Sequence, residues 1–176
     1  MGEWHLGFDV RWADLDPNQH VRHTAYADYG THVRMSWLAS AGFDAARFEA
    51  LRIGPVILLE QNRYLKEVAA GDRLEYDLKV AGASEDASRF RLRHEIRRGD
   101  GRVAARIEVE GGWMDLDARR LKPPPPELAA ALRALVPTDD FERLEPYGSR
   151  RARGERDGVG EERPSRGEAG EGDRNA

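Results

Sequence analysis

One segment of the chain repeats its apolar residues with a helical period, whereas the segments around it alternate. In residues 24–42, one helical face collects Tyr26, Tyr29, Gly30, Val33, Trp37 and Ala41. Residues 5–12 alternate before this helix, with Leu6, Phe8, Val10 and Trp12 on one side. Four further strand-like segments follow it: residues 55–68 have an apolar first half, and residues 73–82, 88–98 and 102–117 alternate. This order predicts an α+β domain in which a largely antiparallel sheet carries one long helix on its face.

The ends of the long helix carry recognisable signals. We expect Thr24 to cap its start with the side-chain hydroxyl. Gly42 followed by Phe43 is typical of a Schellman motif, which ends a helix with a left-handed residue and a hydrophobic contact. Gly30 in the middle is expected to let the helix approach the sheet closely. A short second helix is expected at residues 44–51.

The 176 residues fit one folded domain, which we place at residues 1–145. A short amphipathic helix at residues 127–136 should close it. Residues 146–176 contain seven basic and seven acidic residues and almost no apolar ones. A segment of this composition buries too little apolar surface to offset its ordering entropy, so we expect a disordered charged tail.

Bulk composition excludes several classes of function. The formal net charge of −4 lies in the domain rather than in the neutral tail, which argues against a nucleic-acid binder. The chain has no cysteine, so disulfides, thiolate catalysis and Cys-ligated metals are ruled out. We see neither a secretory signal nor a membrane-spanning run, and we expect a cytoplasmic protein. Nucleophile-elbow, phosphate-loop and dinucleotide-binding motifs are also missing from the sequence.

Acid–base and amide side chains crowd into the stretch ADLDPNQHVRH, residues 13–23. It holds two aspartates, one asparagine and two histidines around Pro17, with no serine or cysteine nearby. Proline, aspartate and asparagine are turn formers, so we read the stretch as a loop between the first strand and the long helix.

The loop and the order of elements resemble the hot-dog-fold acyl thioesterases over roughly residues 5–117. The D-x-D-P spacing at Asp14 and Asp16 resembles enzymes like 4-hydroxybenzoyl-CoA thioesterase. DLDPNQHV resembles the DLDxNQHVNN of acyl-carrier-protein thioesterases, and YLKEVAAGDRL at residues 64–74 is a second anchor. The resemblance implies a hot-dog fold, in which a five-stranded sheet wraps around one long helix. It also implies hydrolysis of an acyl-CoA or acyl-carrier-protein thioester, with no cofactor and no metal.

The resemblance assigns roles within the loop. Asp16 would attack the thioester carbonyl or activate water, and these two roles stay open. Asn18 would hold the water or the thioester oxygen, and His20 would relay a proton, which an imidazole does readily near neutral pH. Each of these residues also has a plain structural reading, as a turn former or hydrogen-bonding group. For Asp14, bracing the loop is our first interpretation.

Other positions would bind the substrate. The resemblance places backbone N–H donors for the developing oxyanion at His23, where the helix begins, and at Gly54. Packing in the core is our first interpretation of Tyr26 and Tyr29, which could also line an acyl tunnel between the helix and the sheet. The family joins protomers through sheet edges, so we expect a homodimer or homotetramer in which Glu60 or Arg63 approaches the partner's loop.

The sequence departs from the family pattern in two places. Arg22 and His23 stand where asparagines are usual, and Tyr64 stands where the plant enzymes carry a further acid, with Glu60 as a nearby substitute. One alternative to hydrolysis is therefore a domain that only binds acyl-CoA or regulates another protein. A metal site built from Asp14, Asp16 and the two loop histidines is a weaker alternative. The strand arginines Arg89, Arg91 and Arg93 are expected to form a solvated face, from which one or two side chains could contact ligand phosphates.

Overall fold

The computed structural model describes residues 3–147. The helices are α1 (His23–Ser40), α2 (Ala45–Leu51) and α3 (Pro126–Arg133), with a short 3-10 turn at Trp12–Asp14. The strands are β1 (Trp4–Asp9), β2 (Ile53–Tyr64), β3 (Arg73–Ser84), β4 (Arg89–Arg98), β5 (Val103–Asp115), β6 (Arg120–Leu121) and β7 (Pro137–Leu144). The long helix, the two shorter helices and the five main strands are all present in the predicted order, with some ends that differ by a few residues.

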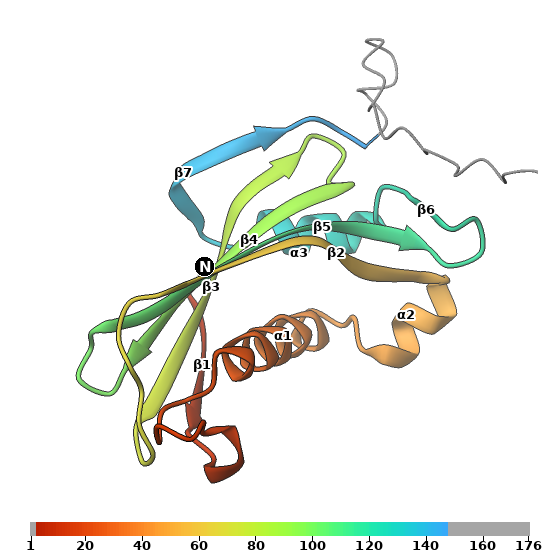
Figure 1. Cartoon of the computed structure of the whole chain (residues 1–176). Helices are drawn as coiled ribbons and strands as arrows, with labels where there is room; N and C mark the ends of the chain where they lie inside the picture. Colours follow the sequence, from red (N-terminus) through yellow and green to blue (C-terminus); the bar gives the residue numbers. More distant parts are fainter. Residues whose placement is uncertain (1–2, 148–176) are drawn as a thin grey trace, which may run out of the picture.

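Five antiparallel strands in the order β1-β3-β4-β5-β2 form the main sheet, which curls around α1 (Figure 1). This is the hot-dog fold. β2 lies at one edge of the sheet, and its side chains from Leu59 to Tyr64 are exposed. Because β2 is an edge strand next to α1, the boundary between the two elements is open on one side.

The apolar face of α1 packs into the concave side of the sheet. Tyr26, Tyr29, Val33 and Trp37 are all buried there, as their helical spacing predicted. Gly30 lies against the sheet, and a Cβ at this position would come within 3.3 Å of the Ile107 side chain. The glycine therefore allows the close approach that we expected from it.

One predicted cap of α1 is confirmed and the other is wrong. Gly42 has φ +85°, and the N–H of Phe43 donates to the carbonyl of Leu38 at 2.8 Å, as in a Schellman motif. At the other end Arg22 is the N-cap residue, with no side-chain hydrogen bond to the helix. Thr24 already lies in the first turn, so its hydroxyl does not cap the helix.

The first strand is shorter than predicted. It ends at Asp9, and Trp12 lies in the 3-10 turn with 82% of its surface exposed. The alternation of residues 5–12 suggested that Trp12 would share a half-buried face with Phe8. That alternation continues past the point where the backbone leaves the sheet, so Trp12 turns outward instead.

Two short strands extend the main sheet. β6 pairs with β5, and β7 pairs in parallel with the second half of β3 (Figure 1). In the same view β7 lies on the side of the sheet away from α1, which we call the outer face. The sequence did not predict β7, because its residues show no alternation of apolar and polar side chains.

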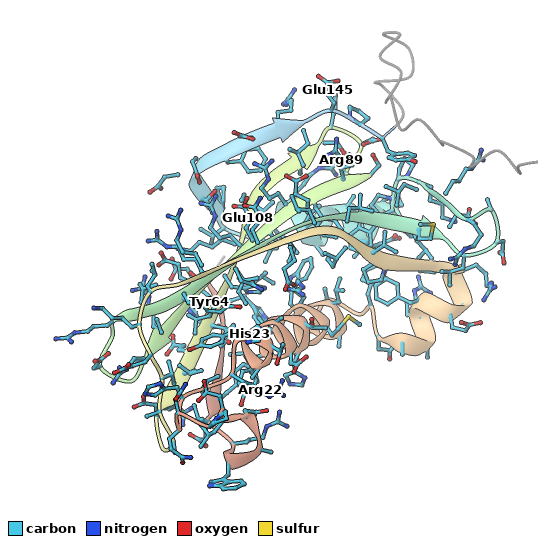
Figure 2. All side chains as sticks on the ribbon, viewed as in Figure 1. Arg22, His23, Tyr64, Arg89, Glu108 and Glu145 are labelled. Carbon is cyan, nitrogen blue, oxygen red and sulfur yellow. The ribbon has the colours of Figure 1, made fainter. Side chains whose placement is uncertain are left out.

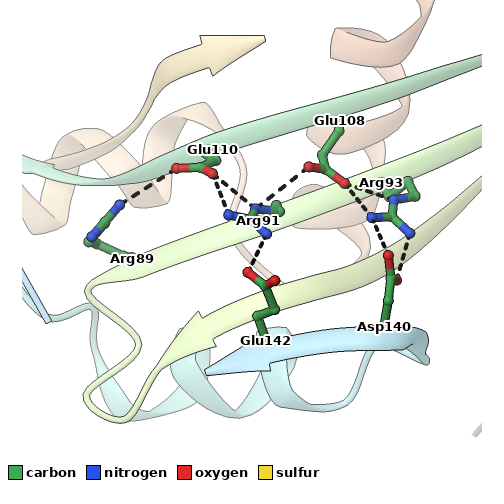
Figure 3. Close-up of polar contacts among 7 residues, drawn as sticks. All are labelled: Arg89, Arg91, Arg93, Glu108, Glu110, Asp140 and Glu142. Atoms are coloured by element: carbon green, nitrogen blue, oxygen red, sulfur yellow. Dashed lines mark hydrogen bonds and ion pairs between the residues drawn. The ribbon is translucent and has the colours of Figure 1, made fainter. Parts of the chain in front are cut away.

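The outer face carries seven paired side chains, which we call the outer ladder (Figure 3). Its members are Arg89, Arg91, Arg93, Glu108, Glu110, Asp140 and Glu142. Arg91, for example, reaches Glu110 at 2.6 Å and Glu142 at 2.8 Å. The strand arginines therefore bind carboxylates of neighbouring strands and are less available to a ligand than the sequence suggested.

The predicted tail at residues 146–176 lies outside the described residues from residue 148 onward. Within residues 3–147, no helix is long and apolar enough to cross a membrane.

Candidate active site

The loop before α1 is shaped by Asp16. Its Oδ1 accepts hydrogen bonds from the backbone N–H of Asn18 at 2.8 Å and of His20 at 3.1 Å. Its own N–H donates to the carbonyl of His20 at 2.8 Å, and Gln19 takes a left-handed φ of 63° to close the turn. Isolated bridges from His20 to Ala69 and from Leu15 to Val21 hold the turn in place. The Asp16 side chain is thus fixed through one oxygen while remaining partly exposed.

Asp14 plays the bracing role expected for it. Its side chain is 2% exposed and accepts two hydrogen bonds from Arg11, at 2.6 and 3.0 Å, and one from the Tyr29 hydroxyl at 2.5 Å. Arg22 also approaches it at 3.4 Å. The hydrogen bonds from Arg11 lower the pKa of Asp14, with smaller contributions from Tyr29 and Arg22. Asp14 is therefore an ionised anchor that ties the loop to α1, and its oxygens face protein groups.

The start of α1 faces the cleft beside Asp16. His23 is the first helical residue, and among the described residues its N–H and that of Thr24 have no backbone acceptor, whereas the N–H of Ala25 donates to the Arg22 carbonyl at 3.0 Å. The Tyr64 hydroxyl, from β2, donates to the His23 carbonyl at 3.2 Å (Figure 2). The Tyr64 ring also packs edge-on against Tyr26, with ring centroids 5.3 Å apart. Burial raises the pKa of Tyr26 to about 12, so its hydroxyl stays protonated at neutral pH.

A cleft of about 340 Å³ lies between this loop, the start of α1 and the end of β2. Its walls include Asp16, His23, Tyr26, Tyr64, Lys66 and Glu67. A carboxylate, unpaired helical N–H groups and an aromatic wall therefore meet in one small space. This combination can bind a carbonyl oxygen at the helix end while the carboxylate acts on the carbonyl carbon or on a water molecule.

The structure brings together some of the predicted site residues and separates others. Asp16, His23 and Tyr26 share the cleft. Asn18 is exposed on the turn, and His20 lies beside the cleft with its Nε2 3.7 Å from Glu67. The Tyr29 hydroxyl binds the buried Asp14, so this tyrosine belongs to the brace behind the loop.

The predicted residues of β2 lie along the strand rather than in the cleft. Gly54 pairs with Met114 at one end, whereas Tyr64 pairs with Ala105 at the other. Ten residues of extended strand, about 33 Å, therefore separate Gly54 from Tyr64 beside the cleft. Within one chain Gly54 and His23 do not converge. Arg63 faces a separate polar depression on the outer face, together with Gln61 and Arg106.

Two members of the cleft were undervalued by the sequence argument. Tyr64 was noted only as a departure from a family acid, and Lys66 was given no role in the site. Tyr64 ends β2 and Lys66 lies two residues beyond it, so a cleft at the end of this strand would have been their common signal. As for the metal alternative, within residues 3–147 no three histidine or acidic side chains gather as ligands would.

Of the two unusual loop residues, Arg22 contacts Asp14 and Asp28 at 3.4 Å each, while His23 faces the cleft.

Solved structures of similar fold come from several bacteria. SAV2348 of Staphylococcus aureus, solved in complex with CoA, is 22% identical, with a TM-score of 0.72 over 78% of this chain and 87% of that one. Slr0204 of Synechocystis, a 1,4-dihydroxy-2-naphthoyl-CoA thioesterase, is 20% identical, with a TM-score of 0.68 over 76% and 98%. PA2801 of Pseudomonas aeruginosa is 24% identical, with a TM-score of 0.66 over 74% and 99%.

These likenesses establish the fold, because their sequence identities are low. No curated protein matches the sequence. A family model does match, and it covers residues 10–132, from the end of β1 to α3. The matched segment includes the whole loop, α1 and the cleft at the end of β2. The chain therefore belongs to the thioesterase-like superfamily.

Proposed function

We propose that the protein is an acyl thioesterase that hydrolyses an acyl-CoA to a free acid and CoA. The observation that carries this proposal is the position of Asp16, whose carboxylate shares a cleft with the first turn of α1. Superfamily membership supports the reaction class, and the CoA complex of SAV2348 favours CoA over a carrier protein as the thiol.

The reaction follows from this geometry. The thioester carbonyl oxygen lies against the N–H groups at His23, where the helix dipole stabilises the negative charge that develops on it. Asp16 either attacks the carbonyl carbon, forming an anhydride that water then hydrolyses, or removes a proton from the attacking water. The C–S bond breaks in both cases, and the thiolate leaves and is protonated. His20, on the same loop beside the cleft, is the imidazole to which we assign the transfer of that proton.

The second oxyanion donor comes from a partner subunit in this proposal. β2 is an unpaired edge strand, and its Ile57, Leu58 and Leu59 are 42%, 57% and 46% exposed. If two copies pair their β2 strands antiparallel in a register centred on Leu59, residue 54 of one strand comes level with residue 64 of the other. Gly54 would then reach the partner's cleft, which it cannot do within its own chain. Leu58→Asp should be a monomer by light scattering and should keep the helical content of the wild type by circular dichroism. It should lose most of its hydrolytic activity.

The direct test follows thiol release from a panel of short, long and aromatic acyl-CoAs. Asp16→Asn should lower kcat by at least about a hundredfold, because general-base or nucleophilic groups contribute about that much or more. Asn18→Ala and His20→Ala should have smaller effects. Asp139→Asn is a matched control, since Asp139 is an exposed aspartate on β7. Full activity in Asp16→Asn would remove the assignment, and tight acyl-CoA binding without release would select the non-hydrolytic alternative.

Single-turnover hydrolysis in ¹⁸O-labelled water separates the two roles of Asp16. With enzyme in excess, a nucleophilic Asp16 acquires the label when the anhydride opens at the enzyme's carbonyl. A general base leaves the label only in the released acid. Mass spectrometry of the peptide that contains Asp16 reads out the difference.

A further inference from the structure

The cleft ends where it meets the boundary between α1 and β2. Among the described residues, its walls include no residue of α1 after Tyr26 and no residue of β2 before Tyr64. An apolar chain that left the cleft along the inner side of the sheet would have to follow this boundary, because the opposite walls at Asp16, Lys66 and Glu67 are polar. The contacts that close the boundary therefore limit the length of the acyl group.

Tyr64 closes the boundary next to the cleft. Its hydroxyl donates to the carbonyl of His23 at 3.2 Å (Figure 2), and its ring packs edge-on against Tyr26 with centroids 5.3 Å apart. Burial raises the pKa of both tyrosines, so both are protonated at neutral pH and Tyr64 keeps the proton that it donates. The Tyr64 side chain is thus held by its ring and by its hydroxyl between the strand and the first turn of the helix.

An ion pair closes the same boundary further along the helix. Nη2 of Arg34, on α1, lies 3.7 Å from Oε2 of Glu60, on β2, and the Arg34 side chain is only 7% exposed. The other oxygen of Glu60 accepts from the Asn62 amide at 3.0 Å. An alkyl chain inserted here would separate two charges without replacing their partners, which is costly at a buried guanidinium.

Neutral groups hold Arg34 in this position. Its Nη1 lies 3.2 Å from Nε2 of His94, and its Nη2 donates to the Thr31 hydroxyl at 3.0 Å. Nδ1 of His94 lies 2.6 Å from the carbonyl of Asp77; because a carbonyl only accepts, Nδ1 carries the proton and Nε2 accepts from Arg34. Burial lowers the pKa of His94 to about 4, so the imidazole is neutral at neutral pH. Hydrogen bonds at both terminal nitrogens therefore keep the guanidinium from swinging aside.

The volume of the cleft sets a similar limit. It measures about 340 Å³, whereas a cavity of about 150 Å³ holds one benzene molecule. The cleft must also hold the thioester group and the attacking water beside Asp16. The space that remains fits one aromatic ring or a chain of about six carbon atoms. In the proposed dimer the partner's β2 runs along the open side of this space and would narrow it.

We propose that Tyr64 is a specificity-determining residue that restricts hydrolysis to thioesters of acyl groups no larger than hexanoyl or benzoyl. The inference rests on the proposed thioesterase function and names its substrate class. A longer chain either displaces Tyr64, with loss of its hydrogen bond to His23 and its contact with Tyr26, or leaves its end in water. In both cases the added methylene groups no longer raise the rate, although burying each one normally strengthens binding.

The test measures kcat/KM for benzoyl-CoA and for the even-numbered series from acetyl- to dodecanoyl-CoA, below the concentrations at which the longer compounds form micelles. For the wild type, kcat/KM should rise to hexanoyl-CoA and then fall by about tenfold at decanoyl-CoA, as expected for one lost hydrogen bond and one lost aromatic contact. Tyr64→Val keeps a residue that favours strands but removes the ring. It should move the optimum to octanoyl- or decanoyl-CoA.

Two control variants separate the ring from other effects. Tyr64→Phe keeps the ring and loses only the hydrogen bond to His23, so it should retain most of the preference for short chains. Tyr147→Ala removes a tyrosine that is 58% exposed and does not line the cleft. It should leave the dependence on chain length unchanged.

The outcomes separate the specificity proposal from the function on which it rests. If wild-type kcat/KM is as high for decanoyl- as for hexanoyl-CoA, the role of Tyr64 is overturned while the thioesterase proposal stands. A short-chain preference that persists unchanged in Tyr64→Val overturns it as well. If no substrate is hydrolysed, the proposed function fails; calorimetry with the same compounds then measures the preference, and affinities that keep rising to decanoyl-CoA overturn it. The wild-type profile remains decisive even if Tyr64→Val does not fold.

Discussion

The arginines on the two faces of the sheet differ in how closely carboxylates pair with them. On the outer face Arg91 and Arg93 each hydrogen-bond two carboxylates, as Arg93 does with Glu108 at 2.8 Å and Asp140 at 2.7 Å, whereas Arg89 lies 3.6 Å from Glu110. On the inner face Arg34 has a neutral histidine and one carboxylate at 3.7 Å. The charged side chains of the outer face form ion pairs with one another. The inner charge retains hydrogen-bonding capacity, and it lies on the side of the sheet that holds the cleft.

The loop repeats this contrast over two residues. Both carboxylate oxygens of Asp14 accept hydrogen bonds from Arg11 or Tyr29. Asp16 accepts hydrogen bonds through one oxygen only, and it borders the cleft. Two carboxylates of the same type, close together in sequence, are thus divided into an anchor and a candidate reactive group by their environments. The predictions below test this division between paired and available charge.

Among the substitutions, the largest effect on stability at neutral pH should come from Asp14→Ala. Removing this carboxylate leaves the buried Tyr29 hydroxyl without its acceptor and frees Arg11, which should lower the free energy of unfolding by about 2–3 kcal/mol. Urea denaturation measures the change. Tyr29→Phe should cost about 1 kcal/mol, because it removes one of the hydrogen bonds. Asp16→Asn should change stability by less than Asp14→Ala; the reverse order would contradict the assignment of anchor and reactive group.

Sequence reasoning predicted the elements of the main sheet and helix because burial on one face leaves a period that can be read. It failed where the backbone, rather than side-chain burial, holds a segment. β7 is joined to β3 by main-chain pairing and to the ladder by acidic side chains, so its sequence shows no apolar alternation. Trp12 continues the apolar alternation of the first strand in the sequence, but the strand ends at Asp9 and Trp12 lies in the 3-10 turn.

The candidate site was predictable only where its residues are neighbours in the chain. Asp16 and His23 lie in one loop, and the resemblance found both. Arg34 shares a helical face with Gly30 and Trp37, but a charged residue on an apolar stripe does not reveal its partner. Glu60 and His94 come from separate strands, and only the sheet register brings them near α1.

Acid should weaken the inner face through His94. Burial lowers its pKa in the folded state to about 4, while the unfolded histidine titrates near its ordinary value of 6.5. Between these values the unfolded state binds more protons, so the free energy of unfolding falls as the pH falls from 6.5 to 4. The loss from this group should be about 3 kcal/mol at the acid end.

His94→Gln isolates that contribution. The glutamine amide can donate to the Asp77 carbonyl and accept from Arg34, but it does not titrate. The difference in unfolding free energy between variant and wild type should therefore shrink as the pH falls from 6.5 to 4. His32→Gln, at an exposed position on the same helix as Arg34, is the control and should keep the wild-type pH dependence. A parallel pair of curves for His94→Gln would show that the imidazole is not buried in its neutral form.

The smallest effect should come from the outer ladder. Arg93→Met removes the hydrogen bonds that hold the pKa of Asp140 at about 2, so that pKa should return toward the ordinary aspartate value in an NMR titration. Partly exposed ion pairs contribute little, and Tm should fall by only about 2–4 °C. Thioester hydrolysis should be unchanged, because the ladder lies on the opposite face from the cleft. Arg102→Met, at a more exposed arginine, should leave the Asp140 titration as it is. A large loss of activity in Arg93→Met would mean that the outer face also serves the substrate, and the contrast between paired and available charge would no longer locate function.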